Sequence, residues 1–149
     1  KTYAAMVLGQ WPASLKVIDV PLHKFLTAEG ERRVMAVSEN QGGQRAISLV
    51  KIQRVYSQFT LLDVTIKTGR THQIRVHLQK IGHPILGDDK YGIDAEDKRL
   101  KVKHLFLHAH LAVFAHPKTQ EKMRVEADVP KAFREWLSRW ECKTLPAQT

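Results

Sequence analysis

The stretch "FTLLDVTIKTGRTHQIRVHLQKIG", residues 59–82, decides the fold because its hydrophobic period changes halfway along. Up to Gly69, apolar and polar residues alternate, and Leu62, Val64 and Ile66 share one face. This pattern predicts a half-buried strand of an antiparallel pair. After Gly69, the apolar residues recur every three or four positions, so we expect the strand to run directly into a short amphipathic helix.

The predicted helix covers residues 71–82, with Ile74 facing the core and Thr71 as its N-cap. The free N–H groups of its first turn and the helix dipole favour an anion at this end. Arg70 lies there, where its guanidinium would meet a phosphate or carboxylate. Arg75, further along, is expected to reach a neighbouring element and hold a carboxylate by two hydrogen bonds. We interpret the cluster as a site that positions acidic groups; a solvated basic helix face is the alternative.

The rest of the chain predicts more strands than helices. Strands are expected within "YAAMVLG" (3–9), "RRVMAV" (32–37), "RAISLVKIQRVYS" (45–57), "LFLHAHLAVFAHP" (105–117) and "EKMRVEADVP" (121–130). A helix is expected to start at Pro130, because apolar residues then recur at helical spacing up to Trp140. Residues 10–31 are expected to hold at most short pieces of structure, and "IDAEDKRLKVK" (93–103) to be a solvated charged loop. The fold class is therefore α+β, with a mixed or mostly antiparallel sheet and a few flanking helices.

Length, charge and cysteine content limit the kinds of partner and location that the chain can have. The chain has 149 residues, enough for one domain, with a disordered tail expected over residues 142–149. A net charge of +9 favours a polyanionic partner such as a nucleic acid. No apolar run approaches the roughly 18–20 residues that a membrane span needs. The single cysteine, Cys142, cannot form an internal disulfide and agrees with a cytoplasmic location.

Metal and nucleotide chemistry have little support in the sequence. His108 and His110 could form a two-ligand arm on one strand face, but no cysteine pair and no H-E-x-x-H accompanies them. The chain has neither a G-x-G-x-x-G nor a G-x-x-x-x-G-K-[ST] motif. We therefore expect no bound metal and no nucleotide cofactor. A histidine-metal hydrolase is the function that a bound ion at His108 and His110 would indicate.

One long string carries a resemblance to a known family. "LLDVTIKTGRTHQIRVHLQKIGHPILGDDKYG" (61–92), with "KTYAAMVLG" (1–9) before it and "LFLHAHLAVFAHPKTQEKMRVEADVP" (105–130) after it, resembles the RluA/RluC-type RNA pseudouridine synthases. The resemblance covers nearly all of residues 1–140 and is strongest to the kind that modifies large-subunit ribosomal RNA. It implies that uridine in RNA is isomerised to its C-glycoside without cofactor or metal. The uridine would first leave its stack and enter a pocket.

The resemblance also implies roles for individual residues. The tyrosine of the family's K-x-Y strand corresponds to Tyr3, which would pack against the flipped base. The arginine of its H-Q-I/L-R element corresponds to Arg75, which would pair with the catalytic aspartate and keep it ionised. Arg70, His72 and Gln73 belong to the same motif and would line the pocket or reach RNA phosphates.

The family's catalytic aspartate lies in an "H-R-L-D-x-x-T-S-G" element that this chain does not contain. Asp63, Asp88 and Asp89 lie in other contexts and are not expected to replace it. The expectation is that residues 1–141 are the C-terminal part of a pseudouridine synthase catalytic domain, inactive alone. Its expected partners are the upstream part of the same polypeptide and large-subunit ribosomal RNA, with no membrane, in a monomer. The alternative is a non-catalytic RNA-binding module that uses the same basic face.

Overall fold

The computed structural model describes residues 1–38, 41–69, 72–115, 118, 122–126 and 130–140. The predicted tail, residues 142–149 with Cys142, lies outside them. The strands are β1 (Thr2–Leu8), β2 (Val17–Asp19), β3 (Leu22–Leu26), β4 (Arg32–Ala36), β5 (Ile47–Val55), β6 (Phe59–Ile66), β7 (Leu107–Ala115) and β8 (Lys122–Glu126). The helices are α1 (Gln73–Lys80), α2 (Asp94–Arg99) and α3 (Lys131–Leu137).

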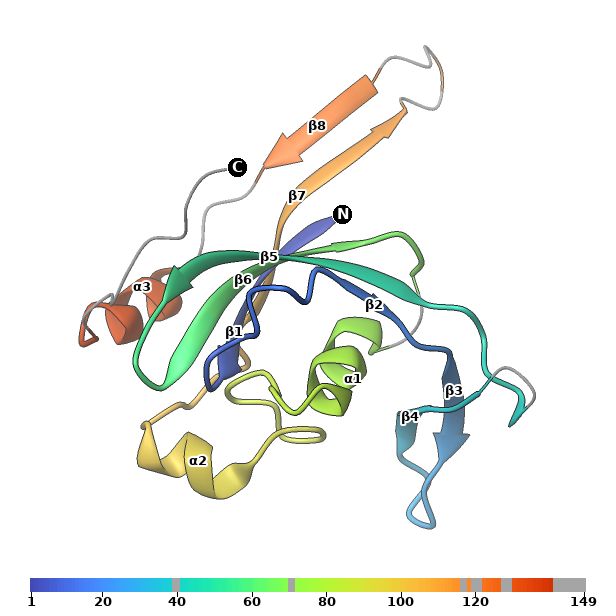
Figure 1. Cartoon of the computed structure of the whole chain (residues 1–149), viewed down its shortest axis with the longest axis horizontal. Coiled ribbons are helices and arrows are strands. Elements are labelled where there is room, and N and C mark those ends of the chain that lie inside the picture. The colour runs from blue at the N-terminus through green and yellow to red at the C-terminus, as the bar shows by residue number, and fades with distance from the viewer. Residues whose placement is uncertain (39–40, 70–71, 116–117, 119–121, 127–129, 141–149) are drawn as a thin grey trace.

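Six strands form one sheet in the order β2-β5-β6-β1-β7-β8, and β3 and β4 form a separate two-stranded sheet. Every strand pair in the described part of the chain is antiparallel. Figure 1 shows β7 and β8 extending beyond the sheet as an arm, while β3 and β4 form a second projection beside α1. The prediction of an α+β fold with a mostly antiparallel sheet is confirmed.

The sheet carries a helix on each face. On β6, Leu62 and Val64 are fully buried, and Val64 lies opposite Val50 of β5 on the face that α1 covers. Phe59 is three residues from Leu62 and therefore points to the other face. There it packs against Trp136 of α3, with ring centroids 4.9 Å apart. The predicted apolar stripe of the last helix is confirmed, because its aromatic side chains bury this second face.

The two ends of α1 are formed differently from each other. Thr71, the predicted N-cap, lies outside the described residues, and the N-cap position belongs to His72, which has a left-handed backbone with φ 52° and no side-chain capping bond. At the other end Gly82, at φ 93°, follows the C-cap Ile81. The N–H of Gly82 donates to the Gln79 carbonyl and that of His83 to the Leu78 carbonyl, each at 3.0 Å. This pair of bonds defines a Schellman ending, at the glycine where the sequence predicts it.

The prediction of a loop over residues 93–103 was wrong, because Asp94–Arg99 form α2. No residue of this helix is buried, so it lacks the apolar period by which a helix is recognised. Charge stabilises it instead. Acidic residues fill its first turn and basic residues its last, which suits the helix dipole, and Asp94 pairs with Lys98 at 3.0 Å. Leu100, just after the helix, is buried and anchors it to the core.

The connection over residues 10–31 does contain short elements, as expected. β2 is a three-residue edge strand paired with β5, and β3 pairs with β4 from Leu22↔Ala36 to Leu26↔Arg32. No helix in the described part of the chain is both long and apolar enough to cross a membrane.

Candidate active site

Arg75 and Asp88 form a two-pronged ion pair beside the start of α1. Arg75 Nε donates to Asp88 Oδ2 at 2.8 Å, and its Nη2 donates to Oδ1 at 2.6 Å. The Asp88 side chain is fully buried, whereas that of Arg75 is 14% exposed. The prediction that Arg75 holds a carboxylate of a neighbouring element by two hydrogen bonds is confirmed, and the carboxylate is that of Asp88.

Further donors fix the Asp88 carboxylate. The backbone N–H groups of Lys90 and Tyr91 both donate to its Oδ1 at 3.0 Å. Burial alone would raise the pKa of Asp88, but the hydrogen bonds from Arg75 and from these two N–H groups outweigh it and lower the pKa. The same pairing raises the pKa of Arg75. Both groups therefore stay charged. Asp89 lies at 3.4 Å from Arg75 Nη2, but its side chain is 88% exposed.

Tyr91 joins this ion pair to the helix start and to the small sheet. Its hydroxyl oxygen lies 2.8 Å from His72 Nδ1 and accepts the Val34 N–H at 2.9 Å. Because the N–H uses the hydroxyl as acceptor, the hydroxyl proton is free to point to His72, which requires a neutral imidazole. Burial, followed by the nearby Arg75 charge, lowers the pKa of His72 and favours this neutral form. The Arg75 guanidinium carbon lies 5.3 Å from the centre of the Tyr91 ring.

The small sheet is tied to the same turn by charged side chains. Arg33 Nη1 donates to the Lys90 carbonyl at 3.0 Å, and Glu31 pairs with Lys90 at 3.0 Å and with Arg33 at 3.2 Å. The side-chain bond from Lys90, more than that from Arg33, lowers the pKa of Glu31. These contacts hold β4 beside α1, so that one edge of the site is built from residues far apart in the sequence.

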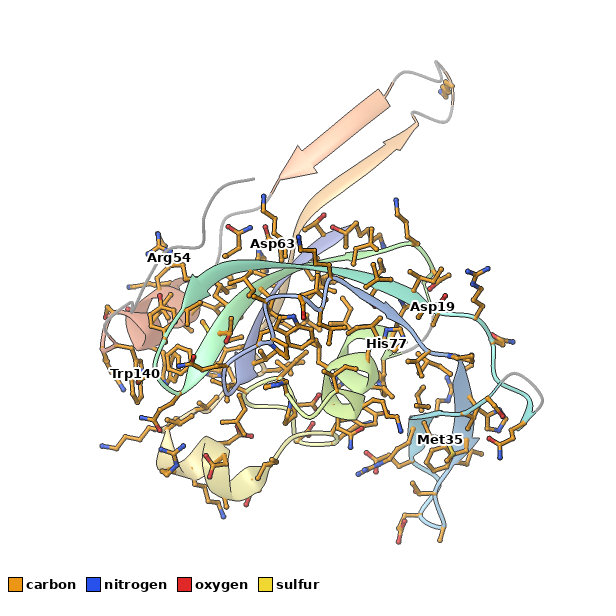
Figure 2. All side chains as sticks on the ribbon, viewed as in Figure 1. Asp19, Met35, Arg54, Asp63, His77 and Trp140 are labelled. Atoms are coloured by element: carbon orange, nitrogen blue, oxygen red, sulfur yellow. The ribbon has the colours of Figure 1, made fainter. Side chains whose placement is uncertain are left out.

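Gln73 and His77 point from α1 into the sheet. The Gln73 side-chain amide donates to the Ile47 carbonyl at 2.8 Å and to Ser48 Oγ at 3.0 Å, and its oxygen accepts the Thr68 hydroxyl. His77 is fully buried, with Nδ1 at 2.8 Å from Ser48 Oγ and Nε2 at 2.8 Å from the Val20 carbonyl. Figure 2 shows His77 between α1 and the strands above it. Both side chains therefore fix α1 to the sheet.

Tyr3 lies on the same face of the sheet as α1. It is half-buried on β1, opposite Val64 of β6 and Ala109 of β7, and Val64 belongs to the face that α1 covers. Among the predicted site residues, the structure thus places Tyr3 on the sheet face that carries His72, Gln73 and Arg75. Arg70 lies outside the described residues.

Sequence reasoning missed most of the residues that surround Arg75. Asp88 and Tyr91 belong to the "GHPILGDDKYG" turn, whose residues carry no period, and Val34 comes from a strand more than fifty residues upstream. The expectation that Arg75 binds a carboxylate was the one sequence signal that indicated a partner such as Asp88. Within the described residues, no group of three or more His, Cys, Asp or Glu side chains could hold a metal ion.

Comparison with known proteins identifies the family. The sequence profile of RNA pseudouridylate synthase matches residues 1–80, which is more than half of the chain. The chain belongs to this family. It is 44% identical to the ribosomal large subunit pseudouridine synthase C of Haemophilus ducreyi over 142 residues, which cover 93% of this chain and 43% of that protein. The enzyme of the same name from Escherichia coli (strain K12) is 40% identical over 144 residues, covering 93% and 44%.

Solved structures of this family share the fold. Human RNA pseudouridylate synthase domain containing 1 superposes with a TM-score of 0.74 at 23% identity, covering 99% of this chain and 61% of that one. Human RNA pseudouridylate synthase domain containing 4 gives a TM-score of 0.72 at 22% identity, covering 97% and 63%. The pseudouridine synthase-like fold expected from the sequence is thus confirmed. The chain spans less than half the length of the two bacterial relatives.

Proposed function

We propose that this chain is the C-terminal part of the catalytic domain of an enzyme that isomerises uridine to pseudouridine in large-subunit ribosomal RNA. The observation that carries the proposal is the 40–44% identity to ribosomal large subunit pseudouridine synthases over more than nine-tenths of the chain. In this reaction the bond from ribose C1′ to uracil N1 breaks and a bond from C1′ to C5 forms. The proton on C5 leaves and N1 gains one, so no atoms are gained or lost overall and no cofactor is required.

The nucleophile in this proposal is an aspartate supplied by residues of the same polypeptide that precede Lys1. Arg75 would orient it and keep it ionised. Support comes from the two hydrogen bonds that Arg75 Nε and Nη2 donate to the fully buried Asp88 carboxylate. The weak contact to the exposed Asp89 is the one that an incoming carboxylate would replace. The ion pair with Asp88 would thereby set the direction of the guanidinium.

Tyr3 would pack against the uracil ring after the uridine leaves its stack. Arg70 and His72 would line the pocket or bind RNA phosphates near the start of α1. Gln73 would act through positioning, since its amide is bound to β5 and Thr68. The charge of +9 suits an RNA partner. A monomeric, cytoplasmic enzyme without metal or cofactor completes the proposal.

The test uses the complete enzyme, including the residues upstream of Lys1, and a uridine-containing fragment of large-subunit ribosomal RNA. Tyr3→Phe keeps the aromatic ring and is expected to retain most of the turnover, whereas Tyr3→Ala is expected to lose at least about tenfold. Release of the C5 proton from labelled uridine measures turnover, and unfolding of each variant controls for stability. Equal turnover for Tyr3→Ala and the unaltered enzyme would refute the role of Tyr3. Absence of pseudouridine with the unaltered enzyme would refute the function, and turnover by residues 1–149 alone would refute the upstream nucleophile.

A further inference from the structure

Two helices of this chain end in the same backbone motif but place different residues at its left-handed position. After α1 this residue is Gly82, with φ 93°. After α2 it is Lys101, with φ 57°. Its N–H donates to the Lys98 carbonyl at 3.1 Å, and the N–H of Val102 donates to the Asp97 carbonyl at 2.8 Å. These are the two bonds of a Schellman ending.

Lysine is unfavourable at this position. A left-handed backbone brings Cβ close to the following carbonyl oxygen, and glycine is preferred there because it has no Cβ. The Lys101 side chain is exposed, and in the described part of the chain it forms no ion pair that would offset this strain. Folding alone would therefore favour glycine. Residues kept in strained conformations point to a functional reason for the side chain.

The surroundings of Lys101 indicate what that reason is. It lines an open cavity between the end of α2 and α3, two helices that Figure 1 shows on the same side of the molecule. Four lysine or arginine residues line this cavity against a single carboxylate, that of Glu135. The lining consists of Lys98, Lys101, Val102, Lys103, His104, Phe106, Ala132, Glu135, Trp136 and Arg139. Lys101, Lys103 and Arg139 are exposed and have no acidic partner within the described residues.

The floor of the cavity consists of buried aromatic side chains. Trp136 is buried, and its indole N–H donates to the Leu100 carbonyl at 3.0 Å, which joins α3 to the residue before Lys101. Trp136 also packs against Phe106 at 4.9 Å between ring centroids. Asp97 of α2 accepts the Gly87 N–H at 3.0 Å, so the cavity is connected to the turn that contains Asp88. Exposed cations gathered around an aromatic floor suit a strand of nucleic acid.

We propose that this cavity, the α2–α3 basic pocket, binds backbone phosphates of the RNA substrate, with Lys101 as its central phosphate contact. This inference rests on the proposed function, because the occupant is the RNA that carries the target uridine. Phosphates away from the reacting nucleotide contribute affinity and fix the register of the strand without reading its sequence. The lysine at the end of α2 is thus kept for binding at the expense of helix-end stability.

The experiment compares RNA binding with thermal unfolding of the same variants of the complete enzyme, including the residues upstream of Lys1. Lys101→Gly relieves the strained backbone and removes the charge, Lys101→Asn removes the charge at a residue that tolerates this backbone, and Lys101→Arg keeps the charge. Lys16→Asn removes an exposed lysine outside the pocket and is the matched control. The probe is a fluorescently labelled single-stranded fragment of large-subunit ribosomal RNA, and its anisotropy is measured over a range of salt concentrations.

Lys101→Gly is expected to raise Tm by about 2–4 °C. It should also weaken RNA binding by about three- to fivefold near physiological salt and reduce the salt slope by about 0.7, as loss of one phosphate contact requires. Lys101→Asn should weaken binding equally, and Lys101→Arg should preserve it.

The inference is overturned if the Lys101 variants bind RNA as Lys16→Asn does, or if Lys101→Gly lowers Tm. If the unaltered enzyme binds the RNA and the Lys101 variants bind it equally well, the pocket alone is refuted. If the unaltered enzyme has no affinity for the RNA, the proposed function is refuted together with the pocket.

Discussion

At the scale of single residues, Arg75 and Asp88 depend on each other because neither is well hydrated. Asp88 is fully buried, and three of its four hydrogen bonds reach the one oxygen Oδ1. Removing one partner of such a pair leaves the other charge without compensation, which is far more destabilising than the net strength of the pair suggests. The adjacent Asp89 has the same charge but remains in water. The two aspartates therefore form a natural comparison.

Asp88→Asn is expected to lower the free energy of unfolding by about 2–4 kcal/mol, because the neutral amide leaves the Arg75 charge poorly compensated. Asp89→Asn, at an 88% exposed side chain, is expected to change it by less than about 0.5 kcal/mol. Urea unfolding of both variants measures the difference. Similar stabilities for the two variants would contradict the structural role assigned to the buried ion pair.

The sequence predicted one side of this pair and not the other. The position of Arg75 on a short helix after a strand favoured a two-pronged contact with a carboxylate. The choice of Asp88 over Asp89 depends on a turn in which the N–H groups of Lys90 and Tyr91 converge on one oxygen. Such convergence follows from backbone angles in residues 87–91, which no periodicity encodes.

At the scale of elements, the two left-handed glycines around Pro84 have different reasons to be glycine. A Cβ added at Gly82, with φ 93°, would meet no atom within 4 Å. A Cβ added at Gly87, with φ 79°, would lie 1.8 Å from the His104 carbonyl oxygen. The chain segment before β7 therefore packs directly on the backbone of the turn, and only glycine permits this approach.

Gly82→Ala is accordingly expected to destabilise the protein by about 1–2 kcal/mol, the strain of a left-handed residue. Gly87→Ala adds a backbone collision to the same strain and is expected to lose on the order of 3 kcal/mol or more. Thermal unfolding of both variants provides the measurement. A Gly87→Ala variant no less stable than Gly82→Ala would show that the close approach to His104 is not required.

The elements that sequence reasoning found share a strong period, and the one it missed has none. β6, α1 and α3 each bury one apolar face, so alternation or helical spacing revealed them. α2 buries no residue and is held by end charges, by Asp97 bonded to Gly87 and by Leu100. Its existence depends on tertiary contacts that a local pattern does not contain. The sequence pointed to Thr71 as the N-cap of α1, whereas the structure has His72 at that position. His72 contacts Tyr91, which is nineteen residues away, and a local pattern does not contain such a contact.

At the scale of the whole molecule, neutral histidines join the helix to both sheets. His77 connects α1 to Ser48 of β5 and to the Val20 carbonyl of the main chain. His72 connects the start of α1 to Tyr91 and, through it, to β4. Burial lowers the pKa of both histidines below the ordinary value of 6.5 and so favours the uncharged rings, although the bond to the Val20 carbonyl acts in the opposite direction on His77.

A lowered pKa in the folded state means that the unfolded chain binds protons at a higher pH than the folded one. The stabilisation from His72 and His77 is therefore complete above pH 6.5 and is lost as the pH falls through their lowered pKa values. The free energy of unfolding should decrease on acidification from about pH 7 to pH 5, by at most about 1.4 kcal/mol per pH unit for His77. Urea unfolding at a series of pH values measures this.

His77→Asn should flatten this pH dependence even though it lowers stability at neutral pH. His104→Asn, at an exposed histidine, should leave the slope unchanged and is the control. If the free energy of unfolding depends on pH in the same way in the unaltered protein, His77→Asn and His104→Asn, the titrating group is not His77.

The Tyr91 hydroxyl contacts two parts of the molecule at once, the backbone of β4 and the ring of His72. The hairpin of β3 and β4 consequently cannot move away from α1 without breaking either the bond from the Val34 N–H to Tyr91 or the contact between Tyr91 and His72. A partner bound to this hairpin would therefore act, through Tyr91, on the start of the helix that carries Arg75.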